Sequence, residues 1–177
     1  MSARGDDQRL GNGGAGVGDA AREDMAGVLA IYNEVIANST AVFSDSPVAL
    51  EEREAWFEAR RAQGYPVLVV RDRSGVAAFG SFGDFRSWPG YRHTVEHSVH
   101  VRADRRGQGI GTAIVAALIV RAGELGKHVM IAGIDADNAG SIRMHERLGF
   151  IQAARLSQVG WKFDRWLDLV LLQRFLP

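Results

Sequence analysis

The hydrophobic positions of this chain recur with two different periods, which predict both helices and strands. In residues 21–37, apolar side chains follow a helical stripe, and Asp19 is a candidate cap for that helix. A second stripe in residues 48–63 predicts another helix, ended by Gly64. Strand-like runs follow at residues 66–71, 76–82 and 94–102.

The pattern changes after Arg102, where a glycine-rich turn leads into a helix that is apolar on nearly all sides. The expected elements from here are a helix at 109–125, a strand at 129–134, a short helix at 139–148, and strands at 150–159 and 166–175. A short strand is also expected near residues 16–18, before the first helix. Antiparallel strands followed by β-α-β units predict an α/β fold with a mixed, mostly antiparallel sheet and helices on both faces.

Composition limits the possible functions of the chain. Among 177 residues, 46% are hydrophobic and 24% are charged, as in ordinary globular proteins. The formal net charge of +0 gives no general attraction to nucleic acid or to anionic membranes. The absence of cysteine excludes disulfides, zinc-thiolate sites and a cysteine nucleophile. We expect a cytoplasmic protein with a mobile Gly-rich tail at residues 1–16 and one domain at residues 17–177.

The glycine-rich turn has the chemistry of an anion site. Gly107, Gly109 and Gly111 alternate directly before a helix whose first N–H groups have no partner within the helix. Arg105 and Arg106 add positive charge, so a pyrophosphate would fit here. The alternatives are a mobile loop with solvated arginines and a Rossmann turn, but the Rossmann turn has G-x-G-x-x-G spacing in the first β-α unit.

His93, Glu96 and His97 match the H-x-x-E-H pattern of some zinc peptidases. That pattern works on a helix, whereas β-branched neighbours predict a strand here. On a strand the two histidines would be about 13 Å apart, too far to share one metal ion. We therefore expect no metal site.

Two motifs carry a resemblance to a known family. Residues 106–111 (RGQGIG) resemble the Q/R-x-x-G-x-G/A signature of GNAT acetyltransferases, and residues 137–150 (DNAGSIRMHERLGF) resemble the family's N-x-x-S-x-x-x-(Y/H)-x-x-x-G-F element. Residues 82–86, 94–99 and 160–168 are similar to the phosphinothricin / methionine sulfoximine N-acetyltransferase branch. His100 departs from that branch, which has tyrosine at this position.

The resemblance implies acetyl-CoA as co-substrate and a parallel strand pair that splays at the coenzyme. It also implies a bulge on the strand that begins at Thr94, which frees a backbone N–H, assigned to Val101, for the thioester oxygen. The expected coenzyme-binding residues are Val99, His100, Val101, Arg106, Gly107, Gln108, Gly109, Ile110, Gly111, Thr112 and Asn138. Asn138 is also a candidate cap for the short helix.

Glu96 and His145 are the expected catalytic residues. Amide formation needs a neutral amine, so a carboxylate at Glu96 would act as general base, directly or through water. The resemblance places His145 where many family members have a tyrosine that protonates the thiolate. The alternatives are a solvent-facing Glu96 and a His145 on the helix surface bonded to backbone.

The expected acceptor is a small amino acid or analogue, such as phosphinothricin, methionine sulfoximine or methionine sulfone, with a role in detoxification. Arg86 would bind its carboxylate, since a guanidinium pairs with a carboxylate through two hydrogen bonds. The full set of expected substrate-binding residues is Phe43, Arg86, Ser87, Trp88, Glu96, His97 and Ser98. The alternatives are an aminoglycoside or polyamine acceptor and a non-catalytic acyl-CoA-binding module. The branch also implies a homodimer, and Trp161 and Trp166 are expected in the core or at that interface.

Overall fold

The computed structural model describes residues 16–177, in which seven strands form one sheet. The spatial order is β1-β2-β3-β4-β5-β7-β6. The strands are β1 (Val17–Asp19), β2 (Val67–Asp72), β3 (Gly75–Asp84), β4 (Thr94–Val101), β5 (Val129–Asp135), β6 (Ile151–Lys162) and β7 (Arg165–Phe175). In this sheet β4 and β5 pair in parallel, and the other neighbours pair antiparallel. The predicted fold class is confirmed, whereas the tail predicted at residues 1–16 lies outside the described residues apart from Gly16.

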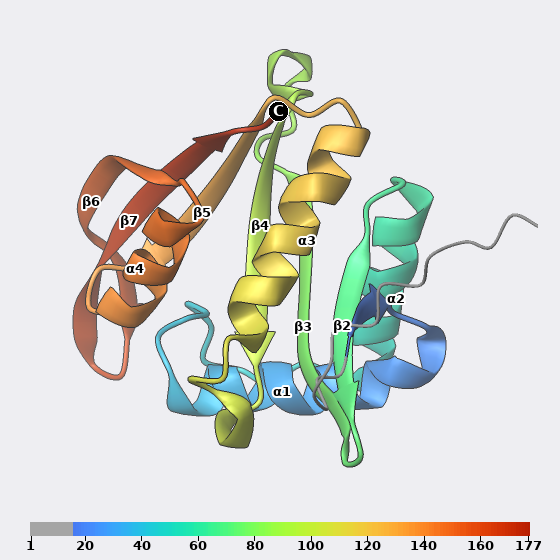
Figure 1. The fold of residues 1–177 in the computed structure, drawn as a ribbon. Coiled ribbons are helices and arrows are strands. Elements are labelled where there is room, and N and C mark those ends of the chain that lie inside the picture. The colour runs from blue at the N-terminus through green and yellow to red at the C-terminus, as the bar shows by residue number, and fades with distance from the viewer. Residues whose placement is uncertain (1–15) are drawn as a thin grey trace, which may run out of the picture.

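Four helices cover the two faces of the sheet (Figure 1). Helices α1 (Met25–Asn38) and α2 (Leu50–Ala62) pack on one face, where Val28 and Phe57 join Phe79 of β3 in a buried cluster. Helices α3 (Ile110–Glu124) and α4 (Ala139–Arg147) cover the other face, where Leu118 packs with Val95 of β4. Within residues 16–177 no helix has the length and apolar character needed to cross a membrane.

The parallel pair separates toward its carboxyl ends, as Figure 1 shows. Pairing between β4 and β5 runs from Thr94↔Val129 to His97↔Ala132, after which β4 follows β3 and β5 follows β7. The predicted splay is therefore present. The predicted bulge is wrong, because β3 and β4 stay in register from Ala78↔Val101 to Asp84↔Val95 without a shift. The gap forms because β4 stays paired with β3 while β5 stays paired with β7, and the two pairs diverge. No inserted bulge residue is needed.

Asp19 is not a helix cap. It ends β1, and its carboxylate pairs with Arg121 at 3.0 Å. The chain instead enters α1 through a 3-10 turn, in which the Asp24 carboxylate accepts the Ala21 N–H at 2.7 Å. Asp24 lies three residues after Ala21, the spacing at which a carboxylate can reach back to the N–H of the capping residue. Asp24 therefore takes the capping role that was predicted for Asp19.

The last two strands form a hairpin that is longer than predicted. Its turn lies at Phe163 and Asp164, whose φ angles are 50° and 55°. Asparagine and glycine usually mark such a turn, and neither is present here. Trp161 and Trp166 face each other across the hairpin, with 48% and 59% of their surfaces exposed, so the expectation that they lie in the core is wrong.

Candidate active site

A cavity of about 870 Å³ opens where β4 and β5 separate. Its walls come from β4, the first turn of α3, the end of β5, α4 and the loop after α1. Gln108 does not line the cavity, because its side chain donates to the Asp104 carbonyl at 3.3 Å. The other expected coenzyme-binding residues do line it: Val99, His100, Val101, Arg106, Gly107, Gly109, Ile110, Gly111, Thr112 and Asn138.

The glycine-rich turn presents backbone donors to this cavity. Gly107 and Gly109 have φ angles of 76° and 79°, a left-handed conformation that favours glycine. The first bond of α3 runs from the Ala113 N–H to the Gly109 carbonyl at 3.1 Å. The N–H groups of the preceding helical residues have no acceptor within the helix, and they lie at its positive end. This turn can therefore hold an anion such as a pyrophosphate.

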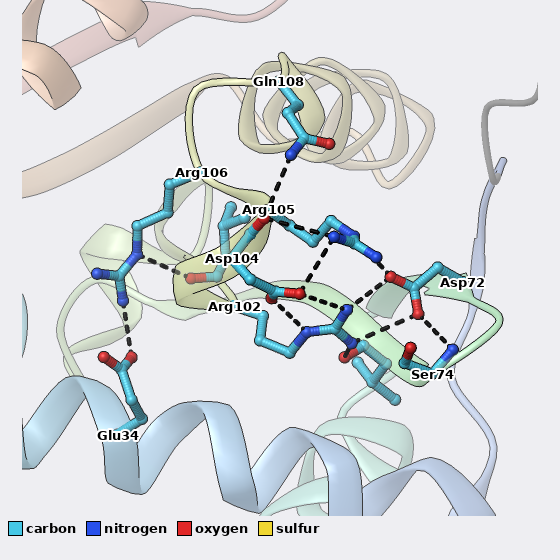
Figure 2. Close-up of polar contacts among 10 residues, drawn as sticks. Glu34, Asp72, Ser74, Arg102, Asp104, Arg105, Arg106 and Gln108 are labelled. Atoms are coloured by element: carbon cyan, nitrogen blue, oxygen red, sulfur yellow. Dashed lines mark hydrogen bonds and ion pairs between the residues drawn. The ribbon is translucent and has the colours of Figure 1, made fainter.

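A network of ion pairs supports the turn from below (Figure 2). Asp72 accepts hydrogen bonds from Arg102 at 2.6 Å and from Arg105 at 2.7 Å, and both arginines also pair with Asp104. The bond from Arg102, the Ser74 N–H and the bond from Arg105 lower the pKa of Asp72 to about 2. The positive charge of Arg105 is thus neutralised by Asp72 and Asp104, whereas the sequence predicted that it would add positive charge to the anion site.

Arg106 is also held by the protein. It donates to Glu34 of α1 at 2.7 Å and to the Val101 carbonyl at 3.1 Å (Figure 2). The arginine therefore ties α1 and the end of β4 to the turn, while it still borders the cavity. Asn138 has two roles: it lines the cavity, and its side chain accepts the Ser141 N–H at 3.1 Å. Its predicted role as a helix cap is confirmed.

Two backbone donors of β4 face the gap. The Arg102 N–H bonds the Ala77 carbonyl of β3 at 2.9 Å. Successive N–H groups of a strand point to opposite sides, so the N–H groups of Val101 and Val99 point away from β3. Beyond His97 no β5 residue pairs with β4, which leaves these groups toward the cavity. The regular alternation of N–H directions along β4 thus turns the Val101 N–H toward the cavity, the role for which a bulge was predicted.

The two faces of β4 carry different chemistry. Glu96, Ser98 and His100 alternate onto the face covered by α1 and α2, while His97 points to the side of α3 and α4. Glu96 is half-buried, and burial raises the pKa of its carboxyl while Arg86 opposes that shift. A Cβ on Gly133 would lie 3.0 Å from the Glu96 Oε1, so a glycine here gives the carboxylate room.

His97 and His145 form a buried pair. Their Nε2 atoms are 3.2 Å apart, and the His145 Nδ1 lies 2.8 Å from the Ser141 carbonyl. A proton on that Nδ1 leaves the His145 Nε2 as acceptor for the His97 N–H. Burial lowers the pKa of both rings. The alternative of a surface His145 is wrong, since the residue is buried, and both of its nitrogens have partners inside the protein.

The loop after β3 does not form a closed acceptor wall. Arg86 stacks on the Phe85 ring at 4.1 Å and donates to the Phe85 carbonyl at 2.8 Å. Ser87 is exposed, and 74% of the surface of Trp88 is exposed. Among the expected substrate-binding residues, the structure places Glu96 and Ser98 on one face of β4, and it places His97 on the other.

The sequence did not reveal how the loop between α1 and α2 is held. The Lys162 side chain is buried, and its ammonium donates to the Ser39 and Val42 carbonyls at 2.8 Å and 2.7 Å. The Thr40 hydroxyl donates to Asp135, a buried carboxylate at the end of β5. Period-two alternation places Lys162 on the same face as Gly160, but only the structure shows that this face is buried here.

Phe43 belongs to this loop and packs over Gly160, where a Cβ would lie 2.4 Å from its ring. The loop residues Ser39, Thr40 and Ala41 line the large cavity. Lys162 and Asp135 therefore fix one wall of the cavity through contacts from distant strands.

The chain is similar to several known acetyltransferases. It is 51% identical over 160 residues to an L-methionine sulfoximine/L-methionine sulfone acetyltransferase of Pseudomonas paraeruginosa, covering 90% of this chain and 93% of that protein. It is 47% identical over 154 residues to an L-amino acid N-acyltransferase of Escherichia coli, covering 87% and 90% of the two chains.

Among solved structures, a phosphinothricin acetyltransferase of Sinorhizobium meliloti in complex with acetyl-CoA superposes with a TM-score of 0.88 at 34% identity. The match covers 90% of this chain and 87% of that one. The model of the Acetyltransferase (GNAT) family matches residues 28–150, which include β4, the glycine-rich turn and α4. The chain belongs to this family and is a GNAT acetyltransferase.

Proposed function

We propose that this enzyme transfers the acetyl group of acetyl-CoA to the α-amine of a small amino acid such as methionine sulfoximine, methionine sulfone or phosphinothricin. The proposal is supported by relatives that carry these substrates or L-amino acids in their names, and by a structural relative in complex with acetyl-CoA. The observation that carries it is the glycine-rich turn of α3, which lines the same cavity as Val99, His100 and Val101 of β4, a few residues after Glu96 on that strand.

We expect the coenzyme to lie in the cavity in one direction. Its pyrophosphate would take the N–H groups at the start of α3, and its thioester would lie between the splayed strands. The Val101 N–H would then donate to the thioester oxygen and stabilise the charge that develops there. Asn138 would contact the pantetheine arm from the opposite side of the cavity.

Glu96 would remove a proton from the ammonium of the acceptor. The neutral nitrogen then attacks the thioester carbon, the carbon–sulfur bond breaks, and the thiolate takes up a proton. A raised pKa suits Glu96 to this role, because a base works best when its pKa lies close to the working pH. His145 remains our proposed proton donor. Its Nε2 accepts the His97 N–H in the structure, so this role requires the ring to leave that contact and to carry a proton on Nε2 when it faces the sulfur.

Arg86 would bind the carboxylate of the acceptor. It carries a guanidinium close enough to Glu96 to affect the pKa of that carboxyl. A positively charged group on the acceptor side disfavours aminoglycosides and polyamines.

We also propose that two copies of the chain associate through the exposed apolar strip of β6, β7 and their turn. The strip consists of Leu156, Val159, Trp161, Phe163 and Trp166. Such a strip is typical of protein interfaces. Sedimentation velocity should show a homodimer for the wild type and a monomer for Trp166→Glu.

The central experiment is a thiol-release assay with acetyl-CoA. Amino acids and their sulfone, sulfoximine and phosphinic analogues should release coenzyme A, whereas aminoglycosides and polyamines should not. Binding of acetyl-CoA without release by any amine would instead indicate a non-catalytic acyl-CoA-binding module.

A further inference from the structure

A second cavity of about 220 Å³ lies on the face of the sheet that α1 and α2 cover. Its lining consists of Tyr32, Val48, Glu52, Arg53, Trp56, Phe79, Ser98 and His100. His100 and Ser98 belong to the same face of β4 as Glu96, and His100 also borders the large cavity. The smaller cavity therefore lies next to the large one, with His100 on the border of both and Glu96 further along the same face of β4.

Arg53 brings a buried charge to this cavity. Only 7% of its surface is exposed, and its Nε has no hydrogen-bond partner among the described residues 16–177. The guanidinium carbon lies 3.8 Å from the centre of the Tyr32 ring and 4.7 Å from that of Trp56. The neighbouring Glu52 does not neutralise it by a direct bond, because its carboxylate accepts the Ala49 N–H at the start of α2.

A buried guanidinium without a bonded carboxylate is costly unless a ligand supplies the missing acceptor atoms. Aromatic rings hold the Arg53 head group in place, so it is pre-organised to donate toward the cavity. The lining thus combines one strong donor with the apolar walls of Trp56 and Phe79.

Methionine sulfone, methionine sulfoximine and phosphinothricin share one side-chain feature. Each ends in a tetrahedral sulfur or phosphorus atom that carries a methyl group and strongly polar oxygen or nitrogen. We infer that Arg53 is a specificity-determining residue that binds this polar group, while the aromatic walls contact the methyl. This inference rests on the proposed function, and it assigns the smaller cavity to the acceptor's side chain.

The spacing along β4 agrees with this assignment. Glu96 and Ser98 are two residues apart, a separation of about 6.6 Å on a strand. Four bonds separate the amine nitrogen of methionine sulfone from its sulfur, which is a comparable reach. An acceptor with its amine at Glu96 can therefore direct its sulfonyl oxygens into the smaller cavity.

The test compares acceptors that differ only in the polar group. kcat/KM is measured for methionine sulfone and for norleucine, which has a similar length and no polar atom, with the wild type, Arg53→Met and Arg53→Lys. We expect Arg53→Met to lower kcat/KM for the sulfone at least ~10-fold, as for loss of a charge-assisted hydrogen bond. The value for norleucine and the KM for acetyl-CoA should change less than twofold, and Arg53→Lys should recover part of the loss.

An equal loss for both acceptors, or no loss for either, would overturn the role of Arg53 and leave the proposed function intact. If the wild type acetylates neither acceptor, the proposed function fails, and this inference fails with it. Near-UV circular dichroism checks that each variant is folded. If Arg53→Met does not fold, Arg53→Gln and Arg53→Lys decide the question through the same ratio of sulfone to norleucine.

Discussion

The two cavities, which we propose for the coenzyme and for the acceptor, are built in different ways. The proposed coenzyme site centres on consecutive residues, from Arg106 to Thr112, with backbone N–H groups at the start of α3. The proposed acceptor pocket collects side chains from α1, α2, β3 and β4, with Arg53 and His100 among them. A backbone site tolerates exchange of most side chains, whereas a side-chain site can change its ligand by a single substitution.

The sharpest test of the acceptor side is Glu96→Gln. The amide keeps the shape of the carboxylate but removes its basic oxygen, so kcat should fall ~10²-fold or more. Binding of acetyl-CoA, measured by calorimetry, should remain close to that of the wild type. An unchanged rate at neutral pH would assign proton removal to another group or to solvent.

The coenzyme side should depend on backbone conformation, which Gly109→Val tests. A β-branched residue is strained at the φ of 79°, at a cost of about 1–3 kcal/mol. The rise in melting temperature caused by acetyl-CoA should therefore disappear, with Gln108→Ala as a matched control that keeps it. Retention of the rise in Gly109→Val would show that side chains, and not this turn, hold the coenzyme.

Arg86→Ala separates the acceptor's carboxylate from its side chain. Loss of a charge-assisted pair should raise the KM of the acceptor roughly 10-fold, while the KM of acetyl-CoA stays constant. The methyl ester of the acceptor should bind the wild type more weakly and should be little affected by the mutation, because both changes remove the same interaction. Equal acetylation of the ester and the free acid by the wild type would exclude an arginine clamp.

The smallest expected effect concerns His100, which borders both cavities. Burial, followed by repulsion from Arg53 and Arg106, lowers the pKa of His100 to about 4. The unfolded chain binds this proton more tightly, so stability is complete above about pH 6.5 and is lost as pH falls toward 4. Each pH unit in that window costs at most about 1.4 kcal/mol for this group. Urea unfolding at several pH values gives the free energy of unfolding as a function of pH. Between pH 6.5 and 4 this free energy should fall less steeply for His100→Gln than for the wild type. Equal pH dependence in the two proteins would contradict the lowered pKa of His100.

The conformation of the glycine-rich turn and the cap at Asn138 could be predicted from the sequence because their determinants are local. The alternating glycines and Asn138 each act within a few residues of their own position. Contacts between distant residues could not be predicted, as in the bond from Lys162 to Ser39, 123 residues apart, which holds one wall of the large cavity. Arg53 gave a weak local signal, because it lies four residues before Phe57 and so on the same buried stripe of α2. A charged side chain is unusual on such a stripe.

The paired arginines beneath the glycine-rich turn affect how coenzyme binding should depend on ionic strength. Arg102, Arg105 and Arg106 are matched by Asp72, Asp104 and Glu34, so these three arginines add little net charge that would attract counterions. Salt screens exposed, unmatched charges most strongly. Affinity for the coenzyme should then vary little with ionic strength, and other polyanions should compete poorly for the turn. We therefore expect selectivity for a pyrophosphate to arise from the direction of N–H groups, not from an excess of positive charge.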